Sequence, residues 1–360
     1  MAAIRLLLYP FALLYGAVMW LRNRLYDSGF FASITFDIPV ISVGNLSVGG
    51  TGKTPHVEYL AQLLRSRFNV ATMSRGYKRR TQGFIIAGDG SDAMQIGDEP
   101  MQYHLKFPDV TVSVAEERLT GIPWLLQQRP ETDVILLDDA YQHRSVRAGL
   151  NILVTDYSRP FYRDHVLPYG RLRESRKAYK RADMIIVSKC PPSLQEAQAT
   201  AIMQQISPLP GQEVFFSTIR YQPAYDLFTQ APVSLAGKHI LLVCCIARPA
   251  SLISAVEGMA AGVHVLSYPD HHYFRDRDIE EIQAAFTNQP EAGTLILTTE
   301  KDATRLHLHA DRLRELQLPI AVLPVTVGIL FGKEDAFNQK IETYTRQALA
   351  AYRSVPEETA

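Results

Sequence analysis

Cysteine is rare in this sequence, and neither sign of charge predominates. The 360 residues include only three cysteines, Cys190, Cys244 and Cys245, which lie in or beside apolar runs and form no CxxC motif. This pattern argues against a disulfide framework and against a zinc site, and it indicates a reducing cytosol. Lys and Arg number 37 and Asp and Glu number 37. The molecule as a whole therefore has no field that would gather nucleic acid, and we expect no nucleic-acid partner.

The sequence also lacks the polarity of a disordered chain. With 47% hydrophobic and 21% charged residues, it can bury sizeable cores. Its length exceeds what one hydrophobic core usually supports, which favours two domains or one large α/β domain. No internal repeat, low-complexity tract or sign of an obligate protein partner is evident.

Residues 6–21 (LLLYPFALLYGAVMWL) carry no charge, and arginines flank them on both sides. A helix of these 16 residues would reach ~24 Å, short of the ~30 Å hydrocarbon core of a bilayer, and Pro10 would interrupt it near its start. A full crossing is not expected, and a secretory signal fits poorly because no small-x-small cleavage site follows. The run predicts a helix lying in one face of a membrane, with its arginines on anionic lipid. The alternative is an ordinary buried N-terminal helix.

Short β-branched runs alternate with helical stretches from residue 38 onward, which indicates βαβ units around a mostly parallel sheet. The first series predicts a helix over 56–67 and strands at 40–43, 70–73, 110–114, 134–137, 152–155 and 184–188. The second predicts helices from Pro249 and Asp276 and strands at 240–245, 263–266, 295–298 and 320–325. We therefore expect an N-terminal membrane-interface helix (1–30), a first α/β domain (31–222), a smaller second one (223–340) and a C-terminal helix (341–360) that packs on the first.

A glycine-rich loop follows the strand at 40–43 and leads directly into the helix. Such a loop at a helix N-terminus binds the phosphates of a nucleotide through backbone N–H groups. Lys53 would reach the β and γ phosphates, and the Thr54 hydroxyl would ligate magnesium. Ser47 replaces the first glycine of the G-x-x-x-x-G-K-[ST] pattern, and the alternative is a glycine-rich turn. The predicted nucleotide-binding residues are Ser47, Val48, Gly49, Gly50, Thr51, Gly52, Lys53 and Thr54.

Two aspartates end the apolar strand at 134–137. A carboxylate there lies at the carboxyl edge of the sheet, where doubly wound folds bind ligands. We assign Asp138 with Thr54 to the metal, and Asp139 with Lys53 to the catalytic residues; either aspartate alone could be a helix cap or turn residue. Together with the loop they predict a P-loop NTPase-like fold that binds ATP and Mg²⁺.

Seven motifs follow one another along the chain. They are SVGGTGKTP (47–55), SRGY (74–77), GDEP (97–100), DDAYQHR (138–144), GRLRE (170–174), DHHYF (270–274) and TTEKDA (298–303). With these motifs in this order, the sequence resembles the tetraacyldisaccharide 4'-kinase family through nearly the whole chain. One departure is CCIARP at 244–249, where a more glycine-containing turn is expected.

The resemblance implies transfer of the γ-phosphoryl group of ATP to the 4'-hydroxyl of a tetraacylated glucosamine disaccharide 1-phosphate. The reaction would occur at the cytoplasmic face of the inner membrane, in lipid A biosynthesis. It further implies that Asp98 and His271 share the proton of the acceptor, with His272 in reserve. Without the resemblance, GDEP would indicate a turn, and the two histidines a polar loop or a weak metal ligand.

Further acceptor contacts are also implied by the resemblance, namely Tyr77, Arg118, Gln142, Arg173 and Glu174. Residues 163–181 hold seven cations and two acids, a local balance of +5. This segment could hold an acidic headgroup and the bilayer around it, or it could be a solvated helix face. Because His271 lies in the second unit and Lys53 in the first, we expect the catalytic set to form only when the domains approach each other.

Two other classes of protein stay open. One is a membrane-associated P-loop ATPase whose hydrolysis drives a partner's cycle, although such loops usually carry a lysine where Val48 stands. The other is a nucleotide-binding interaction module without chemistry, which would not need Asp98 and His271 together.

Overall fold

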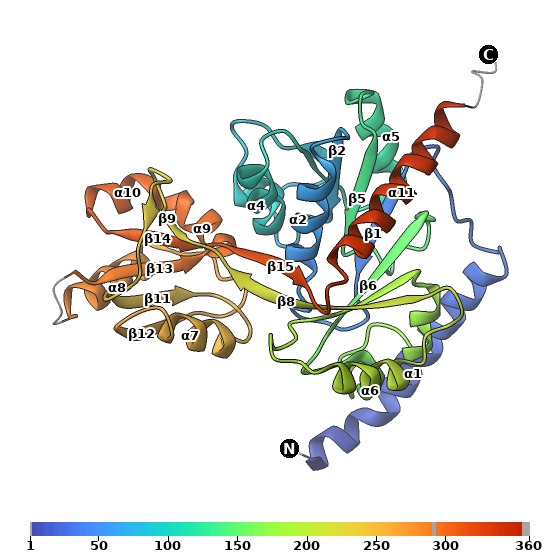
Figure 1. Cartoon of the computed structure of the whole chain (residues 1–360), viewed down its shortest axis with the longest axis horizontal. Helices are drawn as coiled ribbons and strands as arrows, with labels where there is room; N and C mark the ends of the chain where they lie inside the picture. The colour runs from blue at the N-terminus through green and yellow to red at the C-terminus, as the bar shows by residue number, and fades with distance from the viewer. Residues whose placement is uncertain (1, 290–292, 355–360) are drawn as a thin grey trace.

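The computed structural model describes residues 2–289 and 293–354, which form two β-sheets with helices on their faces (Figure 1). Met1 and residues 355–360, at the ends of the predicted N-terminal and C-terminal segments, lie outside the described residues. The mixed α/β architecture with mostly parallel sheets confirms the predicted fold class.

The first sheet has nine strands in the order β15-β8-β7-β6-β1-β5-β2-β4-β3. Its strands from β8 to β4 are parallel, and the edge strands β3 and β15 are antiparallel to their neighbours. The strands are β1 (Val40–Gly44), β2 (Val70–Ser74), β3 (Ile85–Ile86), β4 (Thr111–Val114), β5 (Val134–Asp138), β6 (Leu150–Asp156), β7 (Met184–Ser188), β8 (Glu213–Tyr221) and β15 (Val325–Ile329).

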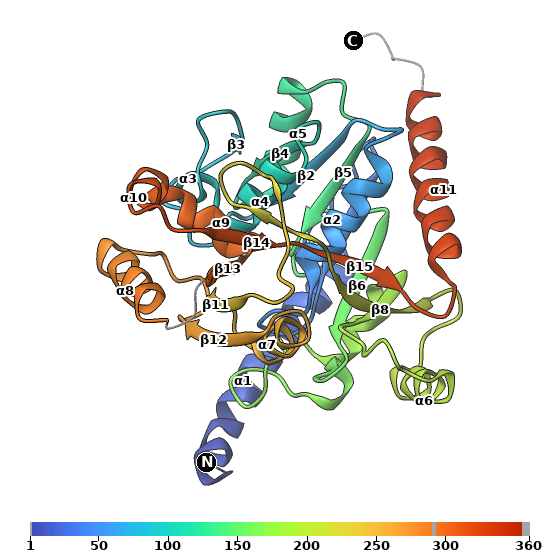
Figure 2. The ribbon, with the colours of Figure 1, turned by 60° about the vertical axis from the view of Figure 1, so that its left-hand side comes forward.

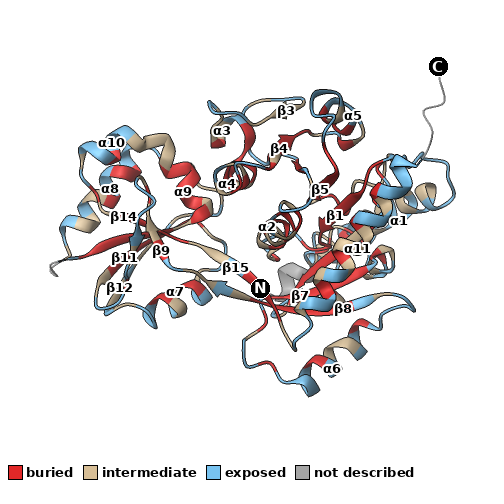
Figure 3. Ribbon diagram, turned by 45° about the horizontal axis from the view of Figure 1, so that its top comes forward, coloured by how far each residue is buried: buried red, intermediate tan, exposed pale blue. Residues whose placement is uncertain are grey.

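Helices cover both faces of this sheet, and its central strands are therefore continuous runs of mostly apolar residues. Alternate residues of β1 face opposite ways: Ile41 packs in the core that includes α2, and Val40 packs in the core that includes α5. Figure 3 shows these strands buried. The helices of this part are α1 (Ala2–Asp27), α2 (Lys53–Leu64), α3 (Ala93–Ile96), α4 (Asp98–Lys106), α5 (Arg118–Gln128), α6 (Glu196–Ile206) and α11 (Glu334–Arg353), with 3₁₀ turns η1 (Phe161–Arg163) and η2 (Arg176–Arg181).

The second sheet has six strands in the order β10-β9-β14-β13-β11-β12, with β12, β11, β13 and β14 parallel. The strands are β9 (Ala224–Asp226), β10 (Pro232–Val233), β11 (His239–Cys244), β12 (Gly262–Ser267), β13 (Leu295–Thr299) and β14 (Ile320–Leu323). The helices are α7 (Ala250–Glu257), α8 (Asp276–Thr287), α9 (Glu300–Leu306) and α10 (Ala310–Glu315), with the 3₁₀ turn η3 (His307–His309).

One strand prediction is wrong. The run at 320–325 is not a single strand, because β14 ends at Leu323 in the second sheet and β15 begins at Val325 in the first. Pro324 lies between them and has no N–H group with which to continue a ladder. The chain thus leaves the first sheet after β8 and returns to it in β15, which pairs with β8 (Figure 1).

After its return the chain forms α11, which packs on the first sheet. Phe337 and Ile341 of α11 are buried in the core that holds Phe215 of β8, and the rings of Phe337 and Tyr59 of α2 lie 5.8 Å apart. Helix α11 therefore covers the face of the sheet on which α2 lies.

Helix α1 corrects a second prediction, since its 26 residues continue through Pro10 without a break. Proline removes one backbone donor from a helix, and here the helix tolerates that loss at an exposed position. Within residues 2–289 and 293–354, no helix combines the length and the hydropathy that a bilayer crossing requires. The N-terminal end of α1 projects from the body of the molecule (Figure 2).

Candidate active site

The loop between β1 and α2 forms an open cradle at the carboxyl edge of the first sheet. Gly49 and Gly52 have φ values of 103° and 88°, a region that strains residues with a Cβ atom. A Cβ added at Gly49 would meet no atom within 4 Å. The Asn45 amide donates a 2.8 Å hydrogen bond to Thr51 Oγ1 across the loop. The loop is therefore held in shape from within while Gly49 faces outward, which leaves its backbone open to a phosphate.

Neighbouring segments also brace this loop. The Val48 N–H donates to the Arg171 carbonyl at 2.8 Å, and the Arg173 N–H donates to the Leu46 carbonyl at 2.7 Å. Gln142 Nε2 donates to the Asn45 carbonyl at 2.9 Å. Lys189, which follows β7, donates to the Gly50 carbonyl at 2.6 Å. The motif at 170–174 therefore lies against the phosphate loop.

Asp138 ends β5 and carries an unpartnered oxygen. The Tyr103 hydroxyl donates to its Oδ2 at 2.9 Å, whereas the buried Oδ1 has no hydrogen-bond partner among the described residues. Burial and the charge of Glu99 raise the pKa of Asp138 to about 7, although Lys53 opposes the shift. A buried carboxylate oxygen without a partner fits a bound cation.

Asp139 faces the loop lysine. Its Oδ1 lies 3.5 Å from Lys53 Nζ, and Arg173 Nη1 donates to its two oxygens at 2.8 and 2.9 Å. Burial favours the neutral acid, but the charges of Lys53 and Arg173 outweigh it and hold the pKa of Asp139 below its usual range. Lys53, Asp139 and Arg173 therefore form one charged cluster beside the loop.

Asp98 and His271 come from different sheets and meet in a hydrogen bond. Asp98 begins α4, His271 lies on the loop after β12, and Asp98 Oδ2 is 2.8 Å from His271 Nδ1. Burial raises the pKa of Asp98, but the bond from His271 and the charges of Lys301 and Arg305 outweigh it and bring that pKa to about 2. His272 instead bonds Asp278 of α8 at 2.8 Å. Of the two adjacent histidines, the structure thus brings His271 to Asp98.

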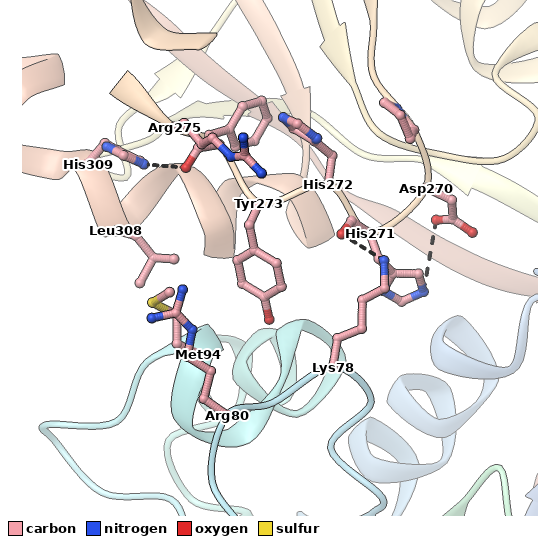
Figure 4. A pocket seen from close by; sticks show the side chains of 12 residues that line it. Lys78, Arg80, Met94, Asp270, His271, His272, Tyr273, Arg275, Leu308 and His309 are labelled. Carbon is pink, nitrogen blue, oxygen red and sulfur yellow. Dashed lines mark hydrogen bonds and ion pairs between the residues drawn. The ribbon is translucent and has the colours of Figure 1, made fainter. Parts of the chain in front are cut away.

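A cavity of about 520 Å³ lies next to this pair, between the two sheets (Figure 4). Lys78, Arg80 and Met94 line it from the first sheet's side, and Tyr273, Arg275 and His309 from the second. Tyr77 is 56% exposed, and its ring centroid lies 5.0 Å from that of His271. Tyr77 is therefore open to a ligand beside the Asp98–His271 pair.

Two predicted acceptor contacts are instead fully buried. Arg118 donates to the carbonyls of Ala115 and Asp138 at 2.8 and 3.1 Å. Glu174 accepts from Arg181 at 2.9 and 3.0 Å and from Asn23 of α1 at 2.7 Å. An acceptor cannot touch either side chain in this structure. Arg118 secures the end of β5, and Glu174 anchors α1.

The expected positive segment at 163–181 is partly neutralised by internal pairs. Arg173 binds Asp139 and Arg181 binds Glu174, while Arg163, Arg171, Lys177 and Lys180 remain exposed. Two further α1 contacts fall beside the site: Tyr15 donates to the Arg173 carbonyl at 2.9 Å, and Arg22 donates to the Gln142 carbonyl at 2.8 Å. Helix α1 is thus fastened to the residues that brace the phosphate loop.

Several site residues were not predicted individually. Lys301 and Arg305 of α9 lie 3.9 and 3.7 Å from Asp98. Lys189 donates a hydrogen bond to the phosphate loop. The motif at 298–303 contains Lys301, but sequence spacing alone could not relate it to Asp98. Lys189 could have been found from its place at the end of a buried strand, at the edge of the sheet where ligands bind.

Comparisons with known proteins agree along nearly the whole chain. The model of the family described as tetraacyldisaccharide-1-P 4'-kinase matches residues 4–346. The tetraacyldisaccharide 4'-kinase of Bacteroides thetaiotaomicron is 46% identical over 353 residues, which cover 94% of this chain and 93% of that protein. The protein of the same name from Porphyromonas gingivalis is 41% identical over 342 residues, covering 93% of this chain and 95% of that one.

A solved structure has the same fold. The crystal structure of LpxK from Aquifex aeolicus in complex with ATP matches with a TM-score of 0.74 at 29% identity, and the match covers 95% of this chain and 99% of that one.

Proposed function

The chain belongs to the tetraacyldisaccharide-1-P 4'-kinase family, and we propose how its own residues perform that activity. The protein is a kinase of lipid A biosynthesis that uses ATP and Mg²⁺ and transfers the γ-phosphoryl group to the 4'-hydroxyl of tetraacyldisaccharide 1-phosphate. One observation carries the mechanism: Asp98, from the same α/β layer as the phosphate loop, shares a hydrogen bond with His271 of the second sheet's layer.

The residues from Ser47 to Thr54 bind the nucleotide phosphates, with Lys53 on the β and γ groups. Thr54 and Asp138 would hold Mg²⁺, which neutralises the charge that develops on the phosphoryl oxygens. The free Oδ1 of Asp138 and its raised pKa support this assignment, because a nearby cation would favour the ionised carboxylate. Asp139 orients Lys53 and Arg173 around the same phosphates.

Asp98 and His271 accept the proton of the 4'-hydroxyl. Phosphoryl transfer has a loose transition state, so positioning and charge neutralisation supply most of the rate and the base needs only modest strength. Asp98 stays ionised at neutral pH, which its low pKa supports, and it stabilises the imidazolium that forms on His271. Tyr77 contacts the acceptor beside them, and Gln142 positions the loop through Asn45.

Helix α1 brings the enzyme to its lipid. Its exposed apolar residues would enter the interface of the inner membrane at the cytoplasmic side, and they are Leu7, Tyr9, Phe11, Leu13, Leu14, Val18, Trp20 and Leu21. Tyr15, Arg22 and Asn23 fasten the same helix beside the phosphate loop. This arrangement supports an acceptor whose acyl chains stay in the bilayer while its sugar enters the site. We also propose that the chain is divided into two α/β domains, which β8 and β15 join.

The test is direct. The purified protein is incubated with ATP, Mg²⁺ and tetraacyldisaccharide 1-phosphate, and the lipid mass is measured. We expect a product heavier by one phosphoryl group, formed in step with ADP. ATP hydrolysis that is equal with and without the lipid, and no change in lipid mass, would instead indicate the partner-driving ATPase.

A further inference from the structure

Lys301 contacts the catalytic imidazole at Nε2, the ring nitrogen that Asp98 does not bond. It is the second residue of α9, and its Nζ lies 3.1 Å from His271 Nε2. The same ammonium lies 3.3 Å from Glu99 Oε1 and 3.9 Å from Asp98 Oδ2. Its side chain is only 20% exposed. Both ring nitrogens of His271 are therefore engaged, one by a carboxylate and the other by a lysine.

The chemistry of these partners fixes where the imidazole proton lies. Burial lowers the pKa of Lys301, but Glu99 and Asp98 outweigh this and raise the pKa above its usual value. Lys301 is therefore an ammonium, which has three donors and no acceptor. His271 Nε2 must then be the acceptor of that contact and carries no proton. The Asp98 carboxylate can only accept, so Nδ1 is the donor in the other contact.

We propose that Lys301 is a positioning residue that keeps His271 neutral, with its proton on Nδ1 and the lone pair of Nε2 reserved for the acceptor hydroxyl. This inference rests on the proposed kinase function. When the hydroxyl arrives, the ammonium withdraws to Glu99, which it already contacts. The hydroxyl proton then moves to Nε2 as its oxygen bonds to the γ-phosphorus. The bond from that phosphorus to the β-phosphate oxygen breaks, ADP leaves, and the imidazolium later releases its proton to water.

The charged surroundings of the ring set the direction of the pH effect. Lys301 and Arg305 are the cations of α9, and Asp302 of the same helix pairs with Arg305. The other acids come from α4 and from the loop that carries His271 itself. Asp98, Asp270, Lys301 and Tyr77 contact the ring, and Lys78 contacts its backbone carbonyl. Glu99 contacts Lys301, Arg305 contacts Asp98, and Asp302 contacts Arg305. Loss of Lys301 removes the cation in contact with Nε2 and leaves Asp98 in contact with Nδ1. The histidine should then bind a proton more readily.

The first test is the pH profile of kcat/KM for lipid phosphorylation, with Lys301→Met, Lys301→Arg and Lys78→Met beside the wild type. Lys78 is the matched control, because it is a nearby cation that donates to the backbone carbonyl of His271, at 3.3 Å, rather than to its ring. We expect Lys301→Met to move the acidic limb upward by about one pH unit. Lys301→Arg and Lys78→Met should leave the limb in place. A kcat/KM that falls by the same factor at every pH in Lys301→Met would overturn the proposal.

The second test reads the proton directly and needs no activity. In ¹⁵N-histidine-labelled protein, with the His271 signals assigned from their loss in His271→Ala, the wild type should show a protonated Nδ1 and an unprotonated Nε2. A proton on Nε2 would overturn the proposal even if Lys301→Met failed to fold. If the wild type shows this tautomer but phosphorylates no lipid, the kinase function fails and the role of Lys301 in holding the ring stands.

Discussion

Asp98 and His271 are 173 residues apart in the chain, yet their side chains share a 2.8 Å hydrogen bond. One begins a helix of the first sheet's layer, and the other lies on a loop of the second sheet. The pair exists because α4 and α9 pack against each other, with Lys301 of α9 bonded to Glu99 of α4. The two sheets therefore already lie close enough to assemble the base that we expected to form only on closure.

We predict that Asp98 and His271 act as a unit. Asp98→Ala and His271→Ala should each lower kcat by about 10²-fold or more, and the double variant should fall little further. Removing either partner disables the same proton transfer. A double-mutant cycle on kcat measures this coupling, and independent losses that multiply would contradict a shared role.

Lys53→Ala should lower kcat/KM for ATP by about 10²- to 10³-fold, or ~3 kcal/mol or more of transition-state stabilisation. The ammonium would neutralise charge on the transferring phosphoryl group, and no other lysine contacts Asp139 within the described part of the chain. Steady-state kinetics check this loss. Lys340→Ala, which removes a lysine of α11 that pairs with Glu213 of β8, is the control and should leave kcat/KM unchanged. Near-wild-type activity of Lys53→Ala would mean that the loop binds something other than a triphosphate.

Asp138→Asn should stabilise the protein at pH 8 in the absence of Mg²⁺ and ATP. The pKa of Asp138 is raised to about 7 in the folded state, so the carboxyl binds its proton more tightly there than in the unfolded chain. Its contribution to stability is complete below pH ~4 and is lost as the pH rises through 7. Thermal unfolding should show a gain in Tm of about 2 °C or more at pH 8 and almost none at pH 4.

Asp139→Asn provides the opposite control for that experiment. The folded-state pKa of Asp139 is lowered, so its ionised form contributes stability above the unfolded pKa, and this is lost as the pH falls through the folded value. Asp139→Asn should therefore lower Tm at pH 8. If both variants shifted Tm in the same direction, Asp138 would not be a buried carboxyl with a raised pKa.

Leu14→Glu together with Val18→Glu should weaken binding to vesicles. These two residues of α1 are 66% and 58% exposed and lie one helical turn apart. Two carboxylates on that face should reduce the fraction bound to phosphatidylglycerol–phosphatidylethanolamine vesicles at least about tenfold, as measured by sedimentation. Trp124→Glu places a charge on a similarly exposed apolar residue of α5, 54% exposed, and should leave binding unchanged. Equal binding of all three proteins would remove α1 from the membrane interface.

Local patterns determined much of this protein. SVGGTGKTP between a strand and a helix predicts a phosphate loop, because its glycines adopt backbone angles that strain other residues. The apolar run that ends in Asp138 likewise predicted its place at the edge of the sheet. These inferences depend on interactions between residues close in sequence, and the family resemblance extended them to the reaction.

Only the tertiary structure decided which distant residues meet. Lys301 reaches His271 because two sheets dock, and β14 and β15 divide at Pro324 because their hydrogen-bond partners lie in different sheets. Arg118 and Glu174 carry charge, which favours the surface, yet they are buried because β5 and α1 offer them partners. Burial and long-range pairing depend on the packing of the whole chain, which spacing along a sequence does not contain.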